Sequence, residues 1–317
     1  MPITNNNTMY NSEVVDHTLD SKYMTDMVKN AQITEFRQLK NIIEKIYLET
    51  GRHISILDIG VGYGRIPLLL SRDPIWRKIK MFIGFDNSLF ELQRAKYTIR
   101  GKIKNKTRII YHDARDIYKK PINKIFRIKY DLVICTYFTP GNFKPLEIKL
   151  DTSKAGRIKK YPKNLLRPNM EFVKIFKNAY KLLNPSGKLV LTIYNQSDEN
   201  RIEQEKFYKK CRMHVITGKN DIFTATKEGF WSQRFTKEMI YEHFRWLQKG
   251  NIEFIPLDAC NFAQIVIISK NPFGTLKDRR SEMIVKRAME KGIGRLCLIT
   301  SGNAGYSLAR ISGNKPF

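Results

Sequence analysis

The chain has no apolar run approaching the ~20 residues that a membrane-spanning helix needs. It has only four cysteines, whose scattered positions exclude a zinc pair or a thioredoxin-type motif and favour a reducing compartment. The five histidines show no metal-ligand spacing. Residues 1–20 are polar and lack a basic-then-apolar signal sequence. We therefore expect a cytoplasmic protein with no metal site and no membrane span.

Acidic residues are also few: 30 Asp and Glu stand against 57 Lys and Arg, which gives a net charge of +27. Such a field attracts polyanions, so nucleic acid is a candidate partner. Against this, the bias towards lysine runs through the whole chain, and there is no RNA-recognition, zinc-finger or helix-turn-helix signature. The densest basic stretch spans residues 144–181, of which residues 144–169 are expected to form a surface insertion.

Glycine is concentrated after one apolar segment. Residues 56–64, ILDIGVGYG, run through Asp58 and then place Gly60, Gly62 and Gly64 at alternate positions. Glycine adopts backbone conformations closed to other residues and lets a ligand lie directly against the main chain. The residues that follow begin a helix, and helix N-termini favour phosphate or nucleotide-like ligands. The segment therefore predicts a strand, a tight turn and a nucleotide-type site.

This spacing resembles motif I of the class I S-adenosylmethionine-dependent methyltransferases, in which an acid precedes three alternate glycines. A dinucleotide-binding fingerprint would need its third glycine one place later, where Arg65 stands. The arginine side chain would crowd a pyrophosphate, so NAD is the weaker interpretation. The resemblance implies an S-adenosylmethionine loop shaped by the three glycines, with Asp58 either supporting the turn or touching the methionine end of the cofactor.

Two later acids follow apolar strands in the order that this family shows. Residues 81–86, MFIGFD, end at Asp86, and by the resemblance this carboxylate would accept hydrogen bonds from both ribose hydroxyls. Residues 107–116 run into the pair Asp113 and Ala114, which would hold the adenine ring. Both acids have a simpler alternative, because Asp is also favoured at the N-cap of a helix that follows a strand.

The fourth strand, expected at residues 130–136, leads to the acceptor side. Residues 136–143, TYFTPGNF, lie where this family places methyl donor and acceptor together, with Thr136, Tyr137 and Asn142 as the expected acceptor-side residues. The segment departs from the Asn/Asp-Pro-Pro-aromatic tetrapeptide of base-modifying enzymes and resembles the Gly-Asn-aromatic exits of small-molecule N-methyltransferases. We expect a small-molecule acceptor, such as an amino acid or related metabolite, with RNA or another nucleic acid as the alternative.

The fold class follows from the alternation of helices and strands. It predicts a Rossmann-like α/β fold, a seven-stranded mostly parallel sheet with flanking helices. The other expected elements are helices at residues 34–50, 170–183 and 237–248, a strand at 188–194 and a closing hairpin at 252–269. We expect a polar segment at residues 1–30 and the methyltransferase domain at residues 31–270. The sequence leaves the oligomeric state open.

Residues 271–317 hold a second resemblance. The segments NPFGTLKDR at 271–279 and TSGNAG at 300–305 resemble two motifs of the fold type II pyridoxal-phosphate enzymes, the threonine synthase and cysteine synthase group. The resemblance implies that Lys277 would form the Schiff base and that Asn303 would bond the cofactor's ring oxygen. The segment, roughly 47 residues, is too short to build that domain. We expect a truncated tail that binds pyridoxal phosphate only with its missing remainder, and a truncated bifunctional enzyme is a further alternative.

Overall fold

Strand β1, Ile54–Ile59, lies in the middle of the sheet around which the chain folds. The computed structural model describes residues 17–18, 20–117, 128–145, 169–218, 221–257, 261–270, 284, 287, 288 and 290. The other strands are β2 Ile79–Asp86, β3 Thr107–Tyr111, β4 Tyr130–Cys135, β5 Leu183–Asn195, β6 Phe223–Ala225, β7 Trp231–Phe235, β8 Ile252–Pro256 and β9 Ala263–Ser269.

The α-helices in this part of the chain are α3 Asp26–Thr50, α4 Arg65–Ser71, α5 Leu89–Thr98, α6 Met170–Lys181, α7 Asp198–Lys210 and α8 Lys237–His243. Short 3-10 helices are η1 Pro74–Lys78, η2 Gly101–Ile103, η3 Ala114–Asp116, η5 Thr139–Asn142 and η6 Lys249–Asn251. None of the helices described is both long and apolar enough to cross a membrane.

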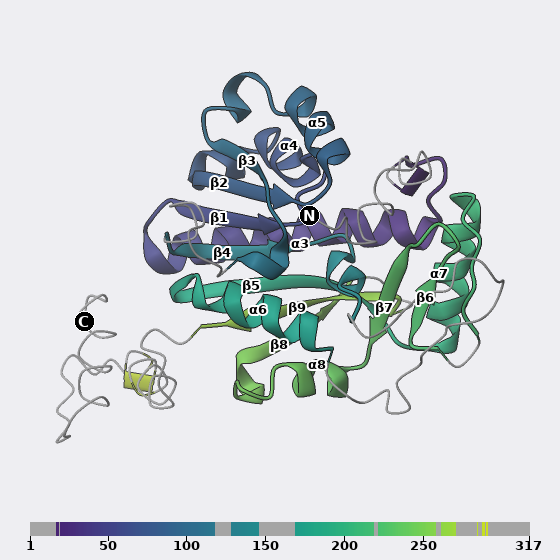
Figure 1. Cartoon of the computed structure of the whole chain (residues 1–317). Helices are drawn as coiled ribbons and strands as arrows, with labels where there is room; N and C mark the ends of the chain where they lie inside the picture. The colour runs from purple at the N-terminus through teal and green to yellow at the C-terminus, as the bar shows by residue number, and fades with distance from the viewer. Residues whose placement is uncertain are drawn as a thin grey trace.

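Seven strands follow the order β3-β2-β1-β4-β5-β9-β8 across the sheet (Figure 1). The first five pair in parallel, and β9 pairs antiparallel with both β5 and β8. This order confirms the Rossmann-like, mostly parallel sheet and its closing hairpin. An additional antiparallel pair, β6 and β7, was not predicted; β7 joins β5 through Tyr194 and Asn195. With α7, these two strands form a lobe at the right of Figure 1.

Alternate residues of the central strands enter two separate cores. In β1, Ile56 belongs to the core that α3 and α4 cover, whereas Leu57 belongs to the core that α6 and α8 cover. This is the period of two expected for a strand buried on both faces. It fixes the register of β1, so that the strand's last residues and the glycine turn emerge together at the carboxyl edge.

Three element boundaries differ from the sequence pattern. Helix α3 begins at Asp26, because Thr25 accepts a hydrogen bond from the Val28 N–H as its N-cap. Helix α8 begins as expected at Lys237, after Thr236, which caps it by accepting from the Met239 N–H, but it ends at His243 and not at residue 248. Strand β5 begins at Leu183 and not at residue 188. It includes the Asn-Pro-Ser-Gly segment at residues 184–187, where its pairing with β4 shifts register. Side-chain periodicity predicts where helices and strands lie, but capping residues and strand pairing determine where they begin and end.

We predict that Phe172→Ala lowers the free energy of unfolding by about 3–5 kcal/mol, the usual loss when a buried Phe is truncated. Phe172 is fully buried in α6, and its ring centroid lies 4.5 to 5.8 Å from those of Phe176, Phe235 and Phe244. Urea unfolding measures the loss. Tyr97→Ala, at a side chain 72% exposed, serves as control and should change stability by less than about 0.5 kcal/mol.

Candidate functional site

Two adjacent cavities lie along the carboxyl ends of β1, β2, β4 and β5. The larger holds about 860 Å³ and the smaller about 510 Å³, with the solvent space at their mouths included. They share Gly60, Asp86, Thr139 and Asn142, and we refer to them together as the crevice. Ligands of doubly wound α/β sheets bind at this edge of the sheet.

The crevice brings together every predicted site residue in the described part of the chain except Gly64. The larger cavity is lined by Asp58, Gly60, Gly62, Asp86, Thr136, Tyr137 and Asn142, and the smaller adds Asp113 and Ala114. Lys277, Asn303 and residues 146–168 of the expected insertion lie outside the described residues, so the inferences drawn from them stay predictions.

The glycine turn after β1 is attached to the end of β2. The N–H groups of Gly60 and Val61 donate to the Phe85 carbonyl at 2.9 and 3.1 Å. Gly60 has a φ of +77°, and a Cβ there would lie 2.7 Å from Thr139 Cγ2, so only glycine fits without a shift of η5. Gly64 instead caps α4 and packs against Ile99, which explains why it does not reach the crevice.

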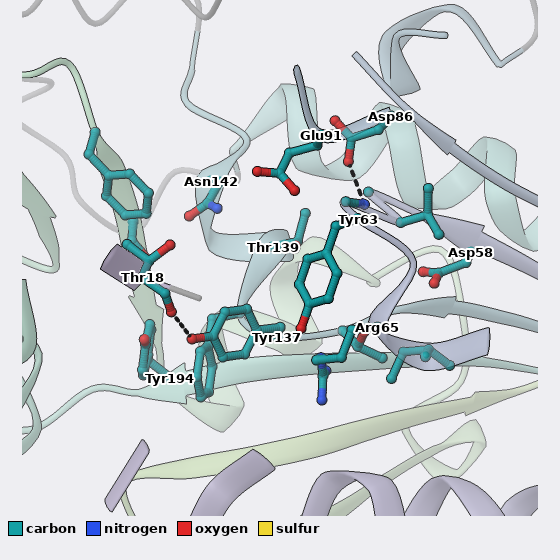
Figure 2. A pocket seen from close by; sticks show the side chains of 18 of the residues that line it. Thr18, Asp58, Tyr63, Arg65, Asp86, Glu91, Tyr137, Thr139, Asn142 and Tyr194 are labelled. Atoms are coloured by element: carbon teal, nitrogen blue, oxygen red, sulfur yellow. Dashed lines mark hydrogen bonds between the residues drawn. The ribbon is translucent and has the colours of Figure 1, made fainter. Parts of the chain in front are cut away.

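Asp86 holds the same turn from the side of β2. Its carboxylate accepts from the Gly62 N–H and the Ser88 N–H, both at 2.9 Å (Figure 2). Burial raises the pKa of Asp86, and these N–H groups partly oppose that rise. The N-cap alternative fails for Asp86, since Ser88 caps α5, but describes Asp113, which caps η3 by accepting from the Arg115 N–H. A carboxylate has about four lone-pair sites, so Asp86 retains capacity for a ligand.

In the described part of the chain, Asp58 places a buried carboxylate oxygen without a hydrogen-bond donor in the crevice. Its side chain is buried at the end of β1, and Oδ1 has no hydrogen-bond partner among the described residues. Burial raises the pKa of Asp58 well above its usual value, opposed by the Arg65 charge and reinforced by Asp86 and Glu35. Buried carboxylate oxygens are normally paired, so this atom indicates a ligand that donates hydrogen bonds or carries positive charge.

The exit of β4 is strained. Tyr137 and Phe138 have φ values of 52° and 62°, a conformation that costs side-chain-bearing residues about 1–3 kcal/mol each. The Tyr137 N–H donates to Glu35 Oε2 at 2.8 Å, and Glu35 also pairs with Arg65. The Phe138 ring stacks on Tyr194 with 3.7 Å between centroids. Such over-determined strain is common at ligand sites.

The lobe forms the far wall of the larger cavity with residues that the sequence did not single out. Phe207 and Tyr208 come from α7, Phe230 precedes β7 and Ser232 lies within it. The larger cavity also touches Thr18, whose carbonyl accepts from the Tyr137 hydroxyl (Figure 2). No local motif marks these positions; adjacent aromatics at 207–208 and 230–231 are the only signal.

Carboxylates dominate the glycine-turn end of the crevice. Asp58, Asp86 and Glu91 line the larger cavity there. Arg65 lines it too but already pairs with Glu35, and Glu91 pairs with Arg94 at 3.4 Å, which leaves Asp58 and Asp86 without a cationic partner of their own among the residues that the structure describes. This end therefore favours a cation. In the described ranges, no group of three or more His, Cys, Asp or Glu side chains is placed to hold a metal ion.

No protein-family model matches the chain. No curated protein matches it either. Among solved structures, it is similar to magnesium protoporphyrin IX methyltransferase of Synechocystis PCC 6803 with S-adenosylhomocysteine bound, at 11% identity and a TM-score of 0.49 over 83% of this chain and 97% of that one. It is also similar to an S-adenosylmethionine-dependent methyltransferase of Clostridium acetobutylicum, at 13% identity and a TM-score of 0.46 over 74% and 92%. The interpretation of the site therefore rests on this chain's own geometry.

We predict that Asp58→Asn stabilises the ligand-free protein by on the order of 1–3 kcal/mol at neutral pH, because it removes an unpaired buried charge. With its folded pKa raised, Asp58 binds its proton more tightly in the folded state. Stability falls as pH rises from the unfolded value, about 3.9, towards the folded pKa. The advantage of Asp58→Asn should therefore grow across that window in urea unfolding experiments.

Asp131→Asn is the matched control for Asp58→Asn. Asp131 is also buried, on the neighbouring strand β4, but accepts from the Ser55 N–H at 2.9 Å and the Asn184 amide at 2.7 Å. The same substitution there should destabilise the protein, because it sets an amide against existing donors. Equal signs for the two variants would contradict our account of Asp58.

Proposed function

We propose that the chain is an S-adenosylmethionine-dependent methyltransferase that acts on a small molecule. The observation that carries the proposal is the Asp58 carboxylate, whose Oδ1 has no hydrogen-bond partner among the described residues and which is buried beside the glycine turn at the carboxyl edge of a mostly parallel sheet. S-adenosylmethionine has two cationic centres, the sulfonium and the ammonium group, and it also carries a ribose and an adenine. It therefore suits an acidic crevice with a turn that has no side chains.

Each part of the cofactor has candidate partners in the crevice. Asp58 would accept from the ammonium group, and Asp86 would accept from a ribose hydroxyl through the lone pair that the N–H groups of Gly62, Ser88 and Asn87 leave free. Asp113 and Ala114 line the smaller cavity, where the adenine would lie. The backbone of Gly60 borders both cavities and so would lie between the two ends of the cofactor.

The chemistry needs placement more than a reactive side chain. S-adenosylmethionine supplies a methyl group on a positively charged sulfur, which is already electrophilic. The protein's task is to hold an acceptor in line with that methyl group, and such orientation can contribute ~7–11 kcal/mol to lowering the barrier. Thr136, Tyr137 and Asn142 line the larger cavity at the strained exit of β4 and are our candidates for that role.

A small acceptor is favoured by the walls of the larger cavity. Phe138, Phe207 and Tyr208 are buried side chains that line it, and an apolar wall suits a compact ligand. Nucleic acid is the second candidate, favoured by the net charge of +27. Incubation with S-adenosylmethionine and either metabolite pools or RNA tests both, with release of S-adenosylhomocysteine as the readout. Release with neither would contradict the proposal.

We predict that Asp86→Ala weakens S-adenosylhomocysteine binding by about 10- to 100-fold, because it removes a ribose acceptor and loosens the Gly62 turn. Calorimetry measures the change. Asp73→Ala is the control: Asp73 also accepts a backbone N–H, from Ile75, but it caps η1 and pairs with Lys40, and it does not line the crevice. An Asp86 variant that folds and binds with wild-type affinity would show that the ribose lies elsewhere.

We predict that Gly60→Ala reduces S-adenosylhomocysteine affinity by at least about tenfold, since its Cβ would meet Thr139 at the mouth shared by the two cavities. Gly51→Ala is a matched control, because Gly51 has a similar positive φ of 64° but nothing within 4 Å of its Cβ. Both variants should lose about 1–2 kcal/mol of stability from the left-handed backbone. Only Gly60→Ala should lose binding; equal affinities in the two variants would contradict the assigned cofactor loop.

A further inference from the structure

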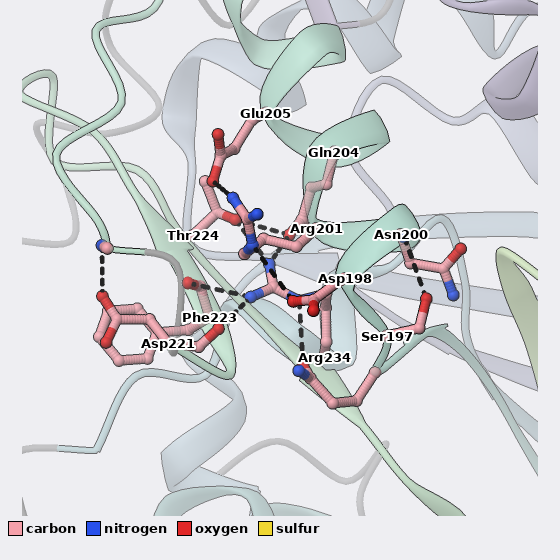
Figure 3. A network of polar contacts seen from close by, with 12 residues as sticks. Ser197, Asp198, Asn200, Arg201, Gln204, Glu205, Asp221, Phe223, Thr224 and Arg234 are labelled. Atoms are coloured by element: carbon pink, nitrogen blue, oxygen red, sulfur yellow. Dashed lines mark hydrogen bonds and ion pairs between the residues drawn. The ribbon is translucent and has the colours of Figure 1, made fainter.

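The lobe contains a buried arginine without an acidic partner. Arg234 in β7 is fully buried and donates to Gln196, Gln204 and Thr224 side chains and to the carbonyls of Asp221 and Phe223 (Figure 3). In the described part of the chain, no carboxylate forms an ion pair with it. Burial lowers its pKa to about 10, so it remains a cation at neutral pH.

This arginine fixes the orientation of the Gln204 amide. A guanidinium has donors and no acceptor, so the Gln204 atom that faces it at 2.5 Å must be the carbonyl oxygen, Oε1. The Gln204 NH2 group then points the other way, towards the Tyr208 hydroxyl and the Ser232 hydroxyl, each at 3.2 Å. Both Tyr208 and Ser232 line the larger cavity.

Three hydroxyl groups lie near Gln204, those of Tyr194, Tyr208 and Ser232, and they have more protons than they can donate to one another. The Tyr208 hydroxyl lies next to the hydroxyls of Tyr194 and Ser232, so at most two of the three hydroxyl protons can be shared within the group. The two Gln204 protons also go to lone pairs of Tyr208 and Ser232. At least one hydroxyl proton is therefore left for another acceptor, at residues that line the larger cavity and have the positive charge of Arg234 behind them.

We propose that the lobe end of the larger cavity binds an anionic oxygen of the methyl acceptor, a carboxylate or a phenolate, through a proton that the hydroxyl pair of Tyr208 and Ser232 retains. The surrounding side chains, Phe138, Phe207 and Phe230, suit an aromatic or apolar body next to that oxygen. That the bound oxygen belongs to a methyl acceptor rests on the proposed function. The anion site itself is inferred from the contacts of Arg234 and Gln204.

Three probes with one aromatic ring test the site: benzoate, 4-nitrophenolate and benzylamine, titrated by calorimetry into the protein with and without S-adenosylhomocysteine. We expect at least one anion to bind about tenfold or more tightly than benzylamine, since a hydrogen bond to a charged group contributes about 1.5–3 kcal/mol. The preferred anion distinguishes a carboxylate from a phenolate. Benzylamine binding as tightly as both anions would overturn the proposal.

Gln204→Glu tests the mechanism with little change of shape. Its carboxylate would pair with Arg234 and would also take the hydroxyl protons of Tyr208 and Ser232 away from the cavity. We expect about tenfold weaker binding of the preferred anion, with S-adenosylhomocysteine affinity unchanged and no loss of stability in urea unfolding. If this variant does not fold, Ser232→Ala should give a loss of about three- to tenfold.

Gln196→Glu is the matched control. Gln196 accepts from Arg234 Nε at 3.0 Å, so the variant neutralises the same arginine, but no hydrogen bond in the described residues joins Gln196 to Tyr208 or Ser232. It should weaken anion binding only about two- to threefold, by charge alone. Equal losses in both variants would overturn the proposal. Failure of S-adenosylhomocysteine to bind would instead contradict the proposed function, and the probe titrations on the ligand-free protein would still decide the anion site.

Discussion

The hydrogen bond from the Gly62 N–H to the Asp86 carboxylate joins the ends of β1 and β2 and determines the shape of the crevice. Together with the Phe85 carbonyl, which receives the N–H groups of Gly60 and Val61, it builds the turn after β1 on the last residues of β2. Asp86 therefore has a structural role before any ligand binds. Its remaining lone pair, and the bare backbone that Asp86 holds in place, are what a ligand meets.

The opposite wall depends on one buried acid. Glu35 in α3 pairs with Arg65 at the start of α4 and accepts from the Tyr137 N–H after β4. A lone buried carboxylate would be costly, but here each charge is paired and hydrogen-bonded. The same contacts offset the unfavourable φ values of Tyr137 and Phe138. Three segments that are distant in sequence thus fix the place where an acceptor would lie.

The sequence predicted what local chemistry determines. Alternate glycines, strands that end in acids and the Thr136 to Asn142 exit located the crevice because each is a short pattern at a strand's carboxyl end. The lobe was missed for a physical reason. In β7 the polar residues Ser232, Gln233 and Arg234 are as buried as their neighbours, so no alternation marks a strand. Their burial is tolerated because hydrogen-bond partners surround them: α7, β6 and Gln196 after β5 bond to Ser232 and Arg234, and Asn169 bonds to Gln233.

The distribution of charge within the site runs against that of the whole chain. A protein of net charge +27 places the unpartnered Oδ1 of Asp58 at the glycine turn and keeps Arg234, a buried cation without an ion pair, behind the lobe wall, as far as the described residues extend. The larger cavity lies between these two ends and so has a polarity of its own. A cationic methyl donor at the acidic end and an anionic oxygen of the acceptor at the lobe end would each be stabilised by the nearer group. Because buried charges are screened less than solvated ones, we expect this internal polarity, more than the surface excess, to select what binds in the cavity.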